Sequence, residues 1–489
     1  IQRCLVGGKT MTNRNKAHID FAEIKNRDLD INSSYPYAYV RIGGLLKGKP
    51  KVIPDDWTYD NIKDKDGYFV KIKIHSIDNL DFPLLSYKND KGIRCWSNDI
   101  NELNQFGVYI GKFALEDAIH FGNMKFEIEQ GYYFDEGRNT KLPIISNYLY
   151  SERKKLKKEG NRAEQIYKLI LNSIFGRTAM KAFDSDLVIK TTQKFVGKAE
   201  NFEDVKKYYI SKKKKVFNEK LYLQDLGFMN IYNGNCYINE AKKFVRRNYN
   251  NIKDWTERGK YWFINKNYNV GEHQNRCHCA VEILDMSKRT LNEVLVLSNK
   301  NNIKVGIIDT DSVQVAKKDV PKITELFENE YGKNPNYYLH KNFFGKKLGQ
   351  WDDDFKLSKS EKLSDIINLN DTDKSDIDSI GAIYLGKKMY IHHLKSADGN
   401  EGFHIRMKGV PTRSIYYYCY ENNCSPFDIY KSLYYGTKIK FDLTCGGYFK
   451  KFEYDTAKQQ CKFNNRFTRE ISLYKNTRDL YKNVLKNIK

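Results

Sequence analysis

Residues 304–315 constrain the fold of this chain more than any other stretch. An apolar, β-branched run leads to Asp309-Thr310-Asp311, and a second β-branched run follows it. This pattern predicts a tight β-hairpin with both carboxylates at or near its tip. Two carboxylates held this close repel each other unless a cation lies between them, and Mg²⁺ prefers oxygen ligands of this kind. The segment alone also fits a surface turn whose Asp residues only cap it, because Asp is common in turns.

A second acidic segment, residues 27–36, favours the metal site. A short predicted strand ends at Asp30 and gives way to a polar turn that carries Tyr35 and Pro36. Asp30 is the natural third carboxylate for a two-metal site, in which one ion activates an attacking hydroxyl and the other holds the leaving phosphate. We therefore expect folding to bring Asp30 beside the hairpin.

Residues 168–176 lie between these two segments and form a predicted helix. Their spacing places Lys168, Asn172 and Phe175 on one face. Gly176 is expected to end the helix. A cation, an amide and a ring on one helical face can bind a nucleoside triphosphate.

The three segments together resemble the polymerase motifs of family B DNA polymerases. Asp-x-x-Ser-x-Tyr-Pro matches residues 30–36, Lys-x-x-x-Asn-Ser-x-Tyr-Gly matches 168–176, and Tyr-x-Asp-Thr-Asp-Ser matches 307–312. Phe175 and Ile307 each stand where the family has Tyr; neither change removes a metal ligand, and both could alter nucleotide affinity. The resemblance implies an α+β, right-hand polymerase fold with an antiparallel-sheet palm, helical fingers, a small thumb and two insertions of the protein-primed type.

The resemblance also implies a DNA-directed DNA polymerase with two Mg²⁺ ions, for which Mn²⁺ can substitute. Its main metal ligands would be Asp30 and Asp311, assisted by the Ile31 carbonyl and by Asp309. Tyr35 would stack against the sugar and exclude a 2′-hydroxyl. The other expected dNTP contacts are Lys155 (with Lys157 as the alternative), Lys168, Asn172 and Phe175. The expected DNA contacts are Gly7, Gly8, Lys388, Tyr390, Arg406 and Lys408.

Six consecutive parts follow from the resemblance. They are palm (1–43), first insertion (44–142), fingers (143–183), second insertion (184–276), palm (277–410) and thumb (411–489). The first insertion is longer than the connection in cellular replicative members, and protein-primed members use it to contact the terminal protein that primes synthesis. A lineage-specific insertion without that role is the alternative. The second insertion would help to encircle DNA, and its interleaved basic and aromatic residues suit single strands.

The net charge of +23 predicts a polyanionic partner. Nucleic acid is favoured over a membrane because the chain has no apolar run of about 18 residues. The expected partners are template DNA, a primer strand, dNTPs, a terminal protein and a separate exonuclease chain or domain. The nine Cys form no Cys-x-x-Cys pair, which favours a reducing compartment, expected to be the host cytoplasm of a virus or linear plasmid.

Two other functions stay open on the sequence. One is a palm-type polymerase that copies or makes RNA, against which Tyr35 argues. The other is a non-catalytic nucleic-acid-binding subunit of a split polymerase, against which the three intact carboxylates argue.

Overall fold

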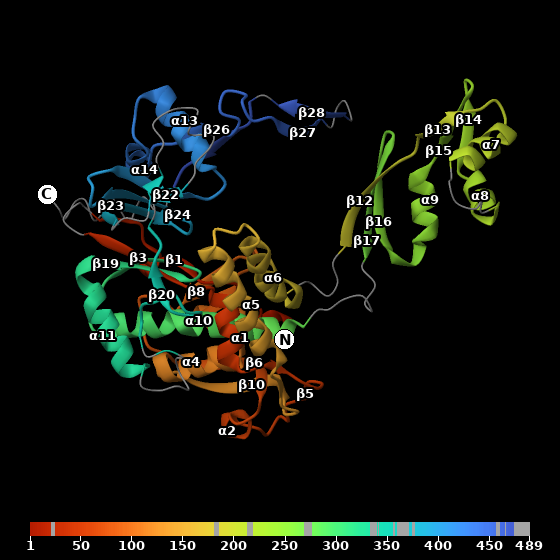
Figure 1. Cartoon of the computed structure of the whole chain (residues 1–489). Helices are drawn as coiled ribbons and strands as arrows, with labels where there is room; N and C mark the ends of the chain where they lie inside the picture. Colours follow the sequence, from red (N-terminus) through yellow and green to blue (C-terminus); the bar gives the residue numbers. More distant parts are fainter. Residues whose placement is uncertain are drawn as a thin grey trace. The chain divides into compact units, whose positions relative to one another are not determined.

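The structure is a computed structural model that describes residues 1–20, 25–179, 185–212, 219–267, 276–332, 340, 342–355, 357–358, 371–373, 377–455, 460–464 and 466–473. The chain forms two units (Figure 1). The first comprises Ile1–Ala179, Arg276–Lys451 and Asn464–Lys489, and the second comprises Met180–Asn275 and Phe452–Phe463. Among the described residues, we find no helix with the length and apolarity needed to cross a bilayer.

A nine-stranded antiparallel sheet organises the first unit. Its main order is β1 (Thr10–Thr12), β18 (Val305–Asp309), β19 (Ser312–Ala316), β3 (Asn26–Ile31), β23 (Ile377–Gly386), β24 (Met389–Ser396) and β25 (Glu401–Met407). β2 (His18–Asp20) pairs with β23, and β20 (Trp351–Asp353) pairs with β3. This sheet is the antiparallel palm that the sequence predicts.

Side chains of the palm sheet alternate between two buried clusters. Ile308 lies in a core with α10 (Cys277–Lys300) and α11 (Val320–Glu330), whereas Ile307 packs with Tyr384 and Tyr390. Successive residues of a strand point to opposite faces, so both faces at this position are covered. This explains why β18 and β19 are buried along almost their whole length.

The predicted first insertion shares a unit with the palm. It contains a four-stranded sheet in the order β5 (Lys51–Val52), β10 (Lys125–Phe134), β6 (Gly67–Ser76) and β9 (Val108–Gly111). Its helices are α2 (Tyr59–Ile62), α3 (Ile100–Phe106) and α4 (Lys112–Gly122), and its short pairs are β7 (Leu85–Lys88) with β8 (Arg94–Ser97) and β4 (Leu45–Leu46) with β11 (Arg138–Asn139).

Helix α10 connects this insertion to the palm (Figure 1). Its buried Glu282 pairs with Arg138 of β11 at 2.7 Å, and its Arg289 pairs with Asp117 of α4 at 2.6 Å. Buried charges are tolerated when they are paired in this way, and removing one partner would leave an uncompensated charge. The paired charges therefore fix the insertion against the palm.

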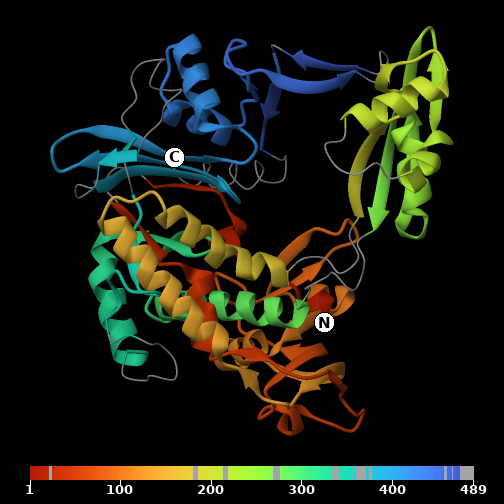
Figure 2. The ribbon, with the colours of Figure 1, turned by 45° about the vertical axis from the view of Figure 1, so that its right-hand side comes forward.

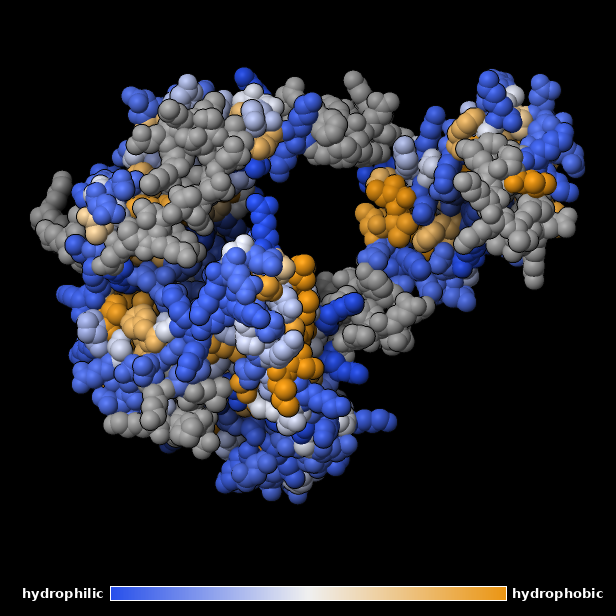
Figure 3. All heavy atoms as spheres, viewed as in Figure 1, coloured by the Kyte–Doolittle hydropathy of each residue, from blue (hydrophilic) through white to orange (hydrophobic). Residues whose placement is uncertain are grey.

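Helices α5 (Lys141–Lys158) and α6 (Glu164–Thr178) lie in the predicted fingers. Helix α1 (Ser34–Ile42), from the predicted palm, packs against both. Helix α6 continues through Gly176 to Thr178, so the predicted stop at Gly176 is wrong. A glycine typically ends a helix by taking a left-handed conformation, which Gly176 does not. Figure 3 shows apolar atoms gathered over the α5–α6 hairpin. The exposed apolar side chains there are Ile144, Ile145, Tyr148, Ile166, Leu169 and Ile170.

The predicted thumb contains α13 (Thr412–Asn422), α14 (Pro426–Tyr434) and a pair of strands, β26 (Ile439–Asp442) and β29 (Thr468–Ile471). Its core joins Ile415, Tyr430 and Phe441 to Ile383 and Ile391 of the palm sheet. β27 (Lys451–Asp455) pairs with β28 (Gln460–Asn464), and β21 (Leu357–Ser358) pairs with β22 (Asp371–Asp373).

The second unit has two three-stranded sheets (Figure 2). One is β12 (Ser185–Thr191), β17 (Tyr261–Asn267) and β16 (Ile252–Arg258); the other is β13 (Lys194–Lys198), β15 (Asn235–Ile238) and β14 (Met229–Tyr232). Its helices are α7 (Phe202–Lys212), α8 (Glu219–Leu226) and α9 (Glu240–Arg247). Trp262 and Ile264 of β17 pack against Ala241 and Val245 of α9.

Candidate active site

The predicted acidic hairpin is formed by β18 and β19. Asp309 ends the first strand, and the Asp311 N–H donates to the Asp309 carbonyl at 2.9 Å. Between them Thr310 has φ +72°, a conformation that β-branched residues rarely adopt. All three turn residues are half-buried. The turn therefore holds two carboxylates close together at the end of a buried hairpin.

Strand β3 places Asp30 beside this turn. Asp30 lies opposite Ser312 in the register of β3 and β19, and the Ile31 N–H donates to the Asp311 carbonyl at 3.0 Å. A separation of 281 residues in the sequence thus becomes one step across a sheet. The structure brings the two acidic segments together as the sequence predicts.

The electrostatics of the turn suit a divalent cation. Burial, followed by repulsion from Asp309, raises the pKa of Asp311 to about 6. Lys388 Nζ lies 3.3 Å from Asp309 Oδ1. A bound cation would relieve the repulsion between the two carboxylates, so the donor set fits Mg²⁺.

Within the described residues, no three His, Cys, Asp or Glu side chains are already gathered around a metal position. Mg²⁺ commonly takes one or two carboxylates and completes its shell with water and substrate phosphates. The full ligand set of Asp30, Ile31, Asp309 and Asp311 therefore stays a prediction.

The predicted nucleotide contacts lie on α1, α5 and α6. Tyr35, in the first turn of α1, stacks on Phe175 with ring centroids 4.5 Å apart and planes 18° apart. Burial, and then repulsion from Asp311, raise the pKa of Tyr35. Lys155, Lys168 and Asn172 are exposed. The structure thus joins Tyr35 and Phe175 at the site and leaves the two lysines and the amide on open helical faces.

The predicted primer contacts border Asp309. Lys388 is the last turn residue before β24, and Tyr390 lies opposite Arg406 in the β24–β25 register. The Lys408 N–H donates to the Lys388 carbonyl at 3.1 Å. Burial, then Asp28 and Asp309, raise the pKa of Tyr390. Lys388, Tyr390, Arg406 and Lys408 therefore form one group at the edge of the acidic site.

Two expectations take a different form in the structure. Ile307 is buried with Tyr384 and Tyr390, so its replacement of Tyr changes packing below the site. A Cβ on Gly8 would lie 2.5 Å from Thr310 Cγ2, whereas Gly7 has nothing within 4 Å of its Cβ position. Gly8 is thus required by contact with the acidic turn.

Three further residues at the site were not predicted from the sequence: Asp28, Thr10 and Arg153. Asp28 is buried next to Gln314, and burial above all raises its pKa to about 7; its spacing of two from Asp30 could have placed it on the same face of the strand. Arg153 of α5 donates to Ser33 Oγ of the acidic segment 27–36 at 3.2 Å, whereas the predicted Lys155 is exposed. Nothing in the spacing distinguishes Arg153 within its basic run.

Comparisons with known proteins agree with this fold. Residues 1–258 match the family "DNA polymerase type B, organellar and viral". Phi29 DNA polymerase complexed with primer-template DNA and incoming nucleotides is similar, with 14% identity and a TM-score of 0.52 over 97% of this chain and 62% of that chain. An orthorhombic crystal form of Phi29 DNA polymerase is also similar, with 15% identity and a TM-score of 0.51 over 96% of this chain and 61% of that chain.

No curated protein matches the chain. The chain spans about three fifths of the length of the Phi29 polymerase chains. At this level of identity, the likeness shows the right-hand polymerase fold. The family match extends over more than half of the 489 residues, and the chain belongs to the organellar and viral type B DNA polymerases.

Proposed function

We propose that the chain is a template-directed DNA polymerase that extends a primer with deoxynucleotides. The observation that carries this proposal is the 3.0 Å hydrogen bond from the Ile31 N–H to the Asp311 carbonyl, which sets Asp30 beside the acidic turn. Carboxylates from two segments that meet across neighbouring strands can hold the metal ions of a phosphoryl transfer. A solved polymerase of the same fold holds primer-template DNA and incoming nucleotides.

Asp30, Asp309, Asp311 and the Ile31 carbonyl would hold two Mg²⁺ ions, or Mn²⁺ in their place. When bound, the ions activate the attacking hydroxyl and neutralise phosphate charge. The chain's own residues align the reactants. Those expected to hold the primer end are Lys388, Tyr390, Arg406 and Lys408. Those expected to hold the nucleotide are Tyr35, Lys155, Lys168, Asn172 and Phe175.

We also propose that synthesis starts on a protein hydroxyl, in a virus or linear plasmid replicated in the host cytoplasm. The support for protein priming is the folded insertion at residues 44–142, which α10 holds against the palm through buried ion pairs. The free thiols among the described cysteines fit a reducing compartment. A separate exonuclease chain or domain would supply proofreading.

The test incubates the chain with labelled dATP and Mg²⁺ in two parallel reactions. One contains a primed DNA template, and the other contains a candidate terminal protein with its origin DNA. Extension of the primer supports the polymerase, and a labelled protein supports protein priming. DNA binding without either product would favour the split-polymerase subunit, and a preference for rNTPs would favour a polymerase of the RNA class.

Replacing Tyr35 by Val should raise ribonucleotide incorporation at least about tenfold relative to deoxynucleotide, because the stacked ring no longer occupies the space of a 2′-hydroxyl. The measurement is kcat/KM for each nucleotide. Tyr35→Phe retains the ring and is the matched control, so its selectivity should stay close to that of the wild type. Unchanged selectivity in the Val variant would remove Tyr35 from this role.

Duplex binding should weaken steeply with salt, with a log–log slope of about 0.9 for each phosphate neutralised. The chain's charge of +23 and the exposed Lys388, Arg406 and Lys408 beside the site motivate this expectation. Lys408→Ala should lower the slope by about one, as measured by fluorescence anisotropy. A slope near zero would contradict phosphate binding.

A further inference from the structure

Three successive residues, Gly8, Lys9 and Thr10, contact the acidic turn. The position that a Cβ on Gly8 would occupy lies 2.5 Å from Thr310 Cγ2. The Lys9 carbonyl accepts the Thr310 N–H at 2.8 Å. The Thr10 hydroxyl, buried at 4% exposure, donates to Asp309 Oδ1 at 3.1 Å. Strand β1 and the two residues before it thus contact the turn through both backbone and side-chain atoms.

The turn needs this support because Thr310 has a positive φ. A β-branched residue keeps such a conformation only where its surroundings over-determine it. The Lys9 carbonyl holds the Thr310 N–H, and Gly8, which has no side chain, leaves room for the methyl group of Thr310. A shift of β1 would therefore disturb the position of Asp309.

Three donors converge on one oxygen of Asp309. Thr10 Oγ1, Thr310 Oγ1 and Lys388 Nζ lie 3.1, 3.4 and 3.3 Å from Oδ1. Lys388 is exposed and Thr310 is half-buried, whereas Thr10 is buried in a strand. The Thr10 hydroxyl is therefore the donor with the least freedom to move when substrate binds.

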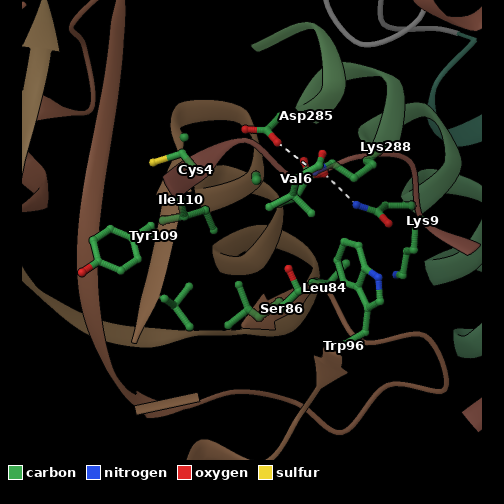
Figure 4. Close-up of a pocket in the computed structure, with 16 residues that line it drawn as sticks. Cys4, Val6, Lys9, Leu84, Ser86, Trp96, Tyr109, Ile110, Asp285 and Lys288 are labelled. Carbon is green, nitrogen blue, oxygen red and sulfur yellow. Dashed lines mark hydrogen bonds and ion pairs between the residues drawn. The ribbon is translucent and has the colours of Figure 1, made fainter. Parts of the chain in front are cut away.

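The side chain of Lys9, the residue before β1, points away from the acidic turn and contacts the first insertion. It extends into a small cavity between the first insertion and α10, where its ammonium donates to the Phe82 carbonyl at 3.0 Å and lies 5.1 Å from the Trp96 ring centroid (Figure 4). Lys288 of α10 lies against the same ring at 5.8 Å. The strand that carries Thr10 is thus tied to the first insertion.

We propose that Thr10 is a positioning residue for nucleotide transfer, which sets the orientation of the Asp309 carboxylate toward the metal site. This inference rests on the proposed polymerase function. Groups that orient a metal ligand typically contribute about 10- to 100-fold to metal affinity or activity. Thr10 acts through Asp309 and does not itself touch the reactants.

The test compares Thr10→Val, which keeps the shape of the side chain, with Thr10→Ser, which keeps the hydroxyl. Thr10→Val should lower kcat about tenfold and weaken Mn²⁺ binding about tenfold, with the KM for dNTP within about twofold of the wild type. Thr10→Ser should restore most of both. Primer extension gives kcat and KM, and electron paramagnetic resonance of free Mn²⁺ gives the affinity without reference to activity.

Thr12→Val is the matched control, because Thr12 is also buried on β1 but lies opposite Ile307. It should leave kcat and Mn²⁺ affinity unchanged. Equal loss in the Thr10 and Thr12 variants, or no loss in Thr10→Val, would overturn the inference. If Thr10→Val is unfolded by circular dichroism, Thr10→Ala against Thr10→Ser repeats the comparison. A wild-type chain that binds Mn²⁺ but extends no primer would instead defeat the proposed function.

Discussion

Replacing Asp311 by Asn, or Asp30 by Asn, should lower nucleotide incorporation by at least about 10³-fold, because metal-assisted charge stabilisation contributes several kcal/mol. Asn has nearly the shape of Asp but no charge with which to hold a cation. Duplex binding should stay nearly intact, since the basic residues that bind the DNA phosphates lie outside the turn. Single-nucleotide incorporation measures the activity, and fluorescence anisotropy of a labelled duplex measures DNA binding.

The Asp311 variant should also be at least as stable as the wild type. Burial and Asp309 raise the pKa of Asp311 to about 6, above its unfolded value, so its charge opposes folding near neutral pH. A neutral side chain removes that opposition. Loss of activity together with an equal or higher melting temperature would separate a chemical role from a structural one.

Asp352→Asn is the matched control for these two variants. Asp352 lies directly opposite Asp30 on β20, which pairs with β3 on the side away from β19, and its side chain is 39% exposed. Its variant should retain most of the activity. Simultaneous loss of incorporation and duplex binding in Asp311→Asn would indicate misfolding, and retained incorporation would show that these carboxylates do not hold the metal.

The sequence was sufficient for the contacts that follow from local pattern. The β-branched runs on both sides of Asp309 and Asp311 predict a hairpin, and β18 and β19 form it. The resemblance to family B polymerases placed Asp30 beside this hairpin. The prediction of a helix end at Gly176 was wrong, because a glycine inside a helix costs only about 1 kcal/mol and α6 continues through it to Thr178.

Contacts that depend on strand register could not be predicted. Thr10 reaches Asp309 across 299 positions in sequence, and a shift of one residue in β1 would have turned its hydroxyl to the other face. Lys9 is similar, because the partners that bury it, Phe82 and Trp96, belong to an insertion whose fold the sequence did not define. Nothing in the sequence around Lys9, which follows two glycines, indicates that its side chain is buried.

Replacing Lys9 by Met should stabilise the first unit at pH 7 and change how its stability depends on pH. Burial, and then Lys288, lower the pKa of Lys9 from 10.5 to about 7. Between these values the unfolded chain binds a proton that the folded chain does not, so the free energy of unfolding rises with pH. The rise is at most about 1.4 kcal/mol per pH unit for one proton. Below pH 7 the contribution of Lys9 is constant.

The stability of the Met variant should therefore exceed that of the wild type most at pH 7 and below, and the difference should shrink as the pH approaches 10. Met cannot replace the hydrogen bond to the Phe82 carbonyl, which would reduce the difference equally at each pH and leave the trend intact. Denaturant unfolding at pH 7, 8 and 9 measures the difference in free energy of unfolding between the variant and the wild type. Subtracting one stability curve from the other removes the titration of Cys and Tyr, which is common to both proteins. Lys16→Met, at an exposed position of the same segment, should give a constant difference. A constant difference for Lys9→Met as well would show that Lys9 keeps an ordinary pKa in the fold.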